Sequence, residues 1–292
     1  MNEFKTYHPI VNFTYFLFVI GFSCFFMHPF CLGISLVSGL IYSVMLKGRK
    51  QARKNLIYML FVVLTMTLIN PLFNHQGVTV LGYFPSGNPF TLESVVYGLS
   101  AGIMLLCIIL HFSCYNEVMT SDKFIYLFGK IIPSLSLVLS MTLRFVPRFI
   151  SQLKVVINSQ KCMGRDIAQG GIIKRAKSAL TILSGIVTWA LENAVDTADS
   201  MKARGYGIPG RTAFSIYTFD KRDKMAFFCI VSLGVYTLVG YILGAMHFSY
   251  FPYIGMAEVS IYNISVILAY LFLCICPIII EIKEVRKWKA SR

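Results

Sequence analysis

Apolar residues in this chain gather in long, almost uncharged runs separated by short polar segments. Several runs reach the roughly 17 to 25 residues that an α-helix needs to cross the hydrocarbon core of a bilayer. We interpret six of them as membrane spans: residues 10–27, 29–46, 55–73, 92–112, 225–246 and 256–280. The pattern predicts an all-α, polytopic membrane protein with a four-span N-terminal domain (1–112), a polar domain (113–224) and a two-span C-terminal domain with a basic tail (225–292).

The charge distribution predicts which side each loop faces. Only 14% of the residues are charged, against about 25% in soluble domains. If the N-terminus is inside the cell, all 27 Lys and Arg residues fall in the inner segments 1–9, 47–54, 113–224 and 281–292, as the positive-inside rule requires. The net charge of +14 then faces the anionic inner leaflet, so we expect no nucleic-acid partner. We expect a plasma-membrane protein with both termini in the cytoplasm.

The apolar segment Phe124–Leu143 is shorter in its uncharged part than a span requires. One more span there would also carry residues 165–224 to the outside and break the charge partition. We therefore expect an interfacial or shallowly re-entrant helix in this segment. Pro147 should end or kink the helix that precedes it.

Two amphipathic helices are predicted in the cytoplasmic domain, over residues 144–163 and 174–204, because apolar residues recur there at helical spacing. The second is too polar to be a span, since Glu192, Asp196 and Asp199 form an acidic row at i, i+4 and i+7. A solvated face and contact with a basic groove of a partner both explain this row.

The second amphipathic helix ends at Ala203-Arg204-Gly205. Gly205 can take the left-handed conformation that closes a helix, and Arg204 complements the helix dipole. One guanidinium flanked by small residues would then be exposed at the tip of a rigid helix, within reach of a partner's carboxylates or carbonyls. An ordinary helix terminus and a partner contact both fit these residues.

Small residues repeat every four positions in three of the spans, a spacing that lets helix backbones approach closely in lipid. Real contacts and chance both account for these rows, which are Ser35, Gly39 and Ser43; Gly98 and Gly102; Gly240 and Gly244.

Motifs for catalysis, nucleotide binding and metal binding are absent from the sequence. The G-x-G-x-x-G at residues 205–210 follows a helix instead of a strand, so it does not indicate a dinucleotide fold. There is no G-x-x-x-x-G-K-[ST], no H-E-x-x-H and no Cys/His cluster. We expect no enzyme activity, cofactor or metal site.

Four segments of the chain resemble the transmembrane T component of energy-coupling factor (ECF) transporters, a family that includes the membrane subunit of cobalt importers. The resemblance covers most of the chain and is clearest in residues 70–77 (NPLFNHQG), 91–94 (TLES), 140–147 (SMTLRFVP) and 198–206 (ADSMKARGY).

The resemblance implies a scaffold whose two long coupling helices each end in an Ala-Arg-Gly-like motif that docks into an ATP-hydrolysing subunit. Residues 203–205 match the second motif. At the expected first motif the sequence reads Cys162-Met163-Gly164, so Met163 replaces the arginine. Either Arg165 substitutes for it, or the first contact is largely apolar.

The same resemblance implies the partners and the activity. Two ABC-type ATPase subunits would hydrolyse ATP, and a membrane S component would bind the substrate, a vitamin or a metal ion. The chain itself would be a non-catalytic subunit that couples the two within an importer.

Two other functions are compatible with a membrane protein. A membrane-embedded enzyme would use Glu93, His111 and Glu258, the ionisable residues near the spans, although their positions close to span ends favour interfacial anchoring. A stand-alone secondary carrier would show internal repeats and broken helices, and we find no convincing repeat.

Overall fold

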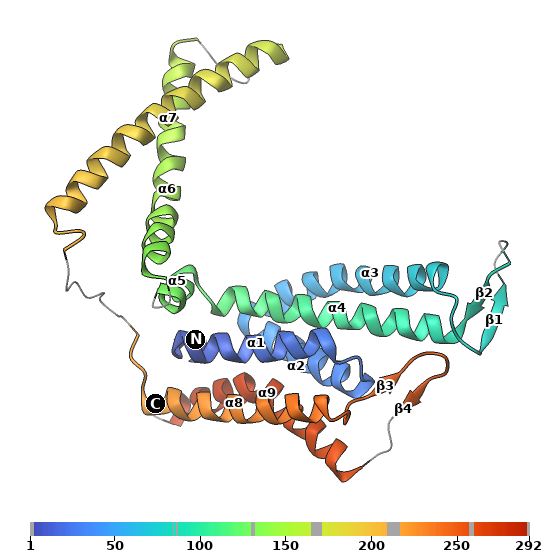
Figure 1. Cartoon of the computed structure of the whole chain (residues 1–292). Helices are drawn as coiled ribbons and strands as arrows, with labels where there is room; N and C mark the ends of the chain where they lie inside the picture. The colour runs from blue at the N-terminus through green and yellow to red at the C-terminus, as the bar shows by residue number, and fades with distance from the viewer. Residues whose placement is uncertain are drawn as a thin grey trace. The chain divides into compact units, whose positions relative to one another are not determined.

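The computed structural model describes residues 3–83, 85, 87–129, 132–164, 171–208, 217–256 and 260–290. Over these residues the chain is almost entirely helical, as the sequence predicts (Figure 1). Its contacts divide it into two compact units. The first joins residues 1–124 with 217–292, and the second comprises residues 125–216.

The first unit is a bundle of long apolar helices preceded by a short 3-10 helix, η1. Its elements are η1 (Glu3–Thr6), α1 (Pro9–Phe25), α2 (Pro29–Lys47), α3 (Arg49–Phe73), α4 (Leu92–Val118), α8 (Lys221–Ile242) and α9 (Ile261–Ala290). Helix α4 packs against α1, α2 and α3, while α9 packs against α2 and α8. The predicted N- and C-terminal membrane segments therefore share one core.

Within the described residues, six helices are long and apolar enough to cross a membrane: α2, α3, α4, α7 (Ile172–Ala203), α8 and α9. Five of them coincide with predicted spans. The remaining predicted span, residues 10–27, corresponds to α1. This helix has 17 residues, which is at the lower limit of about 17 for a spanning helix. Helix α7 qualifies by length and hydropathy, although the sequence analysis placed it outside the membrane because of its acidic row.

Glycines bring α3 and α4 into close contact. A Cβ added to Gly98 would lie 2.8 Å from Cβ of Asn70, and one added to Gly102 would lie 3.0 Å from Cα of Val63. The small-residue row on α4 is therefore a real helix contact. The row of Gly240 and Gly244 is divided: a Cβ added to Gly240 would lie 2.6 Å from the Val266 side chain on α9, whereas Gly244 follows the end of α8 with φ +82° and a Cβ there would meet nothing within 4 Å.

Charged side chains hold the residues that precede α1. The carboxylate of Glu281 on α9 accepts the N–H of Glu3 at 2.9 Å. Lys123, on the short helix α5 (Ser121–Gly129), donates its ammonium to the carbonyl of Lys5. These bonds connect η1 to α5 and α9, elements far away in the sequence.

Two short antiparallel hairpins occupy loops for which the sequence predicted no regular structure. Strand β1 (Val80–Tyr83) pairs with β2 (Pro89–Thr91), and β3 (Phe248–Ser249) pairs with β4 (Gly255–Met256). The last predicted span therefore begins too early at residue 256, since α9 starts at Ile261.

The second unit consists mainly of two long helices, α6 (Pro133–Cys162) and α7. The sequence predicted one helix in Phe124–Leu143 and another from residue 144. Instead α5 ends at Gly129, and α6 continues without interruption through Pro147. Pro147 removes the N–H partner of the Leu143 carbonyl, yet the helix does not end there.

Candidate functional site

Helix α7 ends in a Schellman motif that exposes Arg204. The N–H of Gly205 donates to the carbonyl of Lys202 at 2.9 Å, and the N–H of Tyr206 donates to that of Met201 at 3.0 Å. Gly205 has φ +80°, a left-handed conformation that an L side chain disfavours. Ala203 and Arg204 are both exposed. The structure therefore places this predicted motif at a sharply ended, accessible helix tip.

Helix α6 ends with the same cap conformation at Met163. Met163 has φ −83° and ψ 13°, against φ −86° and ψ 10° for Arg204. Gly164 has φ +74°, and its N–H donates to the carbonyl of Lys161 at 3.0 Å. Cys162 is exposed, and Met163 is 61% exposed. Arg165, the predicted substitute for the arginine of the first motif, lies outside the described residues.

Aromatic contacts fix the crossing of α6 and α7 (Figure 1). The ring of Phe149 meets that of Trp189 edge-on at 5.4 Å between centroids. The guanidinium carbon of Arg148 lies 5.7 Å from the centroid of the same Trp189 ring, within the range of a cation–π interaction. Because one tryptophan contacts two residues of α6, the two helices hold each other in a defined arrangement.

A groove of about 530 Å³ lies between α6 and α7. Its walls hold three arginines, one aspartate, two small hydroxyl residues and three apolar side chains. They are Met141, Arg144, Phe145 and Arg148 from α6, and Asp196, Thr197, Ser200, Met201 and Arg204 from α7. The sequence pattern did not predict this groove. Arg144 and Arg148, four residues apart on one helix face, were its only local signal.

The ionisable residues considered for a membrane-embedded enzyme make structural contacts. Glu93 is 2% exposed, and its carboxylate accepts the N–H of Thr79 at 3.0 Å. His111 is 1% exposed, and its Nδ1 donates to the carbonyl of Cys107 at 2.8 Å. Glu258 lies outside the described residues. Among the residues that the structure describes, no group of three or more His, Cys, Asp or Glu could hold a metal ion.

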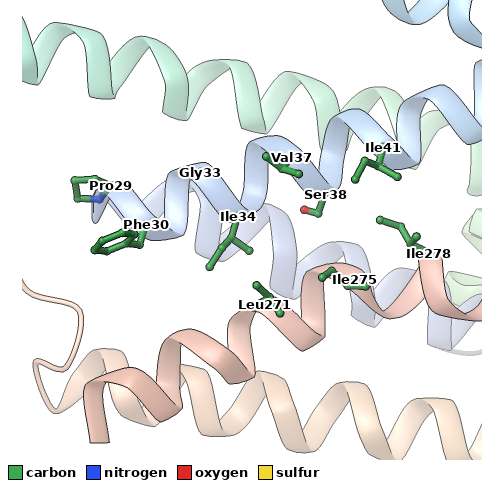
Figure 2. A pocket seen from close by; sticks show the side chains of 10 residues that line it. All are labelled: Pro29, Phe30, Gly33, Ile34, Val37, Ser38, Ile41, Leu271, Ile275 and Ile278. Carbon is green, nitrogen blue, oxygen red and sulfur yellow. The ribbon is translucent and has the colours of Figure 1, made fainter. Parts of the chain in front are cut away.

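A second pocket, of about 450 Å³, lies between α2 and α9 in the first unit (Figure 2). Its lining is apolar apart from Ser38, whose hydroxyl already donates to the carbonyl of Ser35 at 3.1 Å. The labelled isoleucines and Leu271 project between the two helices (Figure 2). This pocket has no group that would orient a polar ligand. The helix tips and the groove between α6 and α7 are therefore the candidate functional site.

Comparison with known proteins gives one family and several relatives. The family model described as "Cobalt transport protein" (CbiQ) matches residues 5–216. The chain is 34% identical over 108 residues to the "Energy-coupling factor transporter transmembrane protein EcfT" of Leuconostoc gelidum, covering 37% of this chain and 40% of the relative.

Two further relatives carry the same description. The Lactobacillus helveticus protein is 36% identical over 103 residues, covering 34% of this chain and 37% of the relative. The Streptococcus thermophilus protein is 28% identical over 194 residues, covering 61% of this chain and 70% of the relative. The alignments with the Leuconostoc and Lactobacillus proteins thus span about two fifths of the length of each relative.

Proposed function

The chain belongs to the CbiQ family of cobalt transport proteins, whose model matches residues 5–216, and we propose that it is the transmembrane scaffold subunit of an ECF-type importer. In this proposal two ABC-type ATPase subunits hydrolyse ATP, a membrane S component binds a vitamin or a metal ion, and this chain connects them. The names of its EcfT relatives support the assignment.

The observation that carries the proposal is the pair of equivalent helix tips in one compact unit. Met163 and Arg204 each cap a long helix immediately before a glycine of positive φ. Two rigid helices joined at their crossing transmit force from one end to the other. Such a unit is suited to turning the movement of two ATPases into movement within the membrane.

The two tips should dock unequally. Arg204 offers five hydrogen-bond donors in a fixed fork, whereas Met163 offers a flexible apolar side chain. We propose that Arg204 binds carboxylates or carbonyls in the groove of one ATPase. In the other ATPase Met163 makes a largely apolar contact, beside which Arg165 provides the positive charge.

Topology follows from the charge partition. We propose that residues 113–224 lie in the cytoplasm, with both termini on the same side and the basic segments facing the inner leaflet of the plasma membrane. Helix α7 then stays outside the bilayer despite its length, because Glu192, Asp196 and Asp199 would otherwise enter it or its boundary at considerable cost. Helix α1, and not α7, then crosses the membrane together with α2, α3, α4, α8 and α9.

The decisive experiment is charge reversal at the tip of α7. Arg204→Glu should abolish co-purification of the ATPase subunit that this tip binds, together with substrate uptake, and Arg204→Ala should weaken both, while the membrane helices stay folded. Lys177→Glu reverses a charge on the same helix far from its tip and should change neither. If Arg204→Glu retains full uptake, the chain does not couple ATPases through this motif.

A further inference from the structure

The groove between α6 and α7 carries an excess of unpaired positive charge. Arg144 and Arg148 on α6 and Arg204 on α7 face it, together with one carboxylate, that of Asp196. All four side chains are exposed. None of them forms an ion pair with another residue in the part of the chain that the structure describes. The groove therefore offers an anionic group the guanidiniums of Arg144 and Arg204, beside that of Arg148, which also contacts the ring of Trp189.

The apolar side chains that line the groove are less exposed than its charged ones. Met141, Phe145 and Met201 are half-buried, whereas the three arginines and Asp196 are exposed. A helix of about 10 to 12 Å in diameter would fill about 530 Å³ with a single turn, so the groove has room for only a few side chains. Its chemistry fits a carboxylate next to an aliphatic or aromatic residue.

We infer that this groove receives an acidic segment of the ATPase subunit that holds Arg204, an inference that rests on the proposed function. Arg204 belongs both to the helix tip and to the groove, so a partner that covers the tip also covers the groove entrance. Asp196 repels a lipid phosphate, whereas a protein segment offers a donor to Asp196 and a carboxylate to the arginines.

Such a contact would bind both helices, α6 and α7, to the same partner segment. A carboxylate between Arg144 of α6 and Arg204 of α7 forms charge-assisted hydrogen bonds to each, and these bonds become stronger when docking excludes water. The partner would then move α6 and α7 together instead of pulling only on the tip of α7. Arg144 and Arg148 thus act as a second docking element for the same ATPase.

The test uses the complete complex, purified through a tag on this chain at low and at high salt. Arg144→Gln should lower the retained amount of one ATPase subunit about three- to tenfold at low salt. At high salt the difference between this variant and the unsubstituted protein should become smaller, because screening weakens the contact in the unsubstituted protein. Arg144→Lys keeps the charge and should restore part of the binding. Lys154→Gln removes an exposed charge from α6 outside the groove and should have no effect.

The outcomes separate this inference from the proposed function. If Arg144→Gln and the double variant Arg144→Gln/Arg148→Gln retain both ATPases while Arg204→Glu loses one of them, the inference is overturned and the scaffold function stands. If Arg204→Glu also retains them, the scaffold function fails as well. If the Arg144 variants lose bound anionic phospholipid but no ATPase, the groove is a lipid site and the inference is equally overturned.

Discussion

Met163 at the end of α6 and Arg204 at the end of α7 hold the same backbone conformation, each immediately before a glycine of positive φ. The residues two positions earlier, Lys161 and Lys202, accept the equivalent hydrogen bonds from the two glycines. The two tips, which carry the side chains of Met163 and Arg204, are therefore equivalent in backbone conformation. What differs between them is the chemistry of those side chains.

An acidic residue at the tip of α6 should disrupt its docking. Met163→Glu would place a charge in a largely apolar contact, which costs at least a few kcal/mol unless it is paired, so we expect at least tenfold less of one ATPase in the purified complex. Met163→Leu preserves an apolar side chain of similar volume and should retain it. Quantitative gel analysis of both ATPases would decide, and full retention by Met163→Glu would contradict an apolar contact at this tip.

Loss of the glycine at the tip of α7 should loosen the last helical turn. Gly205 has φ +80°, which costs a residue with a Cβ roughly 1 to 2 kcal/mol, and its new Cβ would also lie 3.1 Å from Cδ1 of Ile208. In Gly205→Ala we expect faster hydrogen exchange at the amide of residue 206 and weaker ATPase docking. Gly171→Ala, at the start of α7 with φ −69° and open space around it, should leave both unchanged.

The sequence predicted features that depend on short stretches of chain. The spans follow from the length of apolar runs, and the end of α7 follows from Arg204 and Gly205, because a helix terminus is determined by its last few residues. The resemblance to the T component also indicated where the first tip lies, at Met163. The physical cause lies within about one helical turn for the end of α7, and within one continuous apolar run of about 17 to 25 residues for a span.

Features that depend on distant contacts could not be predicted in this way. The bond between Glu281 and the N–H of Glu3 joins residues 278 positions apart, and the groove combines Arg144 with Arg204 from separate helices. Pro147 also shows the limit of a local rule: the missing N–H disfavours a helix interior, but α6 continues through this exposed residue.

A larger side chain at Gly102 should separate α3 from α4. A Cβ at this position would lie 3.0 Å from Cα and 3.2 Å from the carbonyl oxygen of Val63, so backbone would have to move. For Gly102→Leu we expect a destabilisation of about 1 to 3 kcal/mol, typical of overpacking, seen as a lower Tm in detergent. Gly21→Leu on α1 is the matched control, because a Cβ there meets nothing within 4 Å. Equal Tm values for the two variants would refute close packing at Gly102.

Lys123 should make stability depend on pH in the alkaline range. It is 5% exposed, and burial, helped by the nearby charge of Lys5, lowers its pKa from 10.5 to about 8. Below about pH 8 the amine is protonated in the folded and unfolded chain alike. Between about pH 8 and 10.5 the unfolded chain binds more protons than the folded one, so the free energy of unfolding rises with pH through this group.

Replacing Lys123 by methionine isolates this contribution from other titrating groups. We expect the Tm of the unsubstituted protein to rise relative to that of Lys123→Met as the pH increases from about 8 to about 10, because only the unsubstituted chain releases this proton on folding. Lys154→Met removes an exposed amine and should give a Tm difference that does not change over the same interval. A constant difference for Lys123→Met as well would mean that the amine keeps its ordinary pKa and that its burial next to the Lys5 carbonyl does not disfavour the charge.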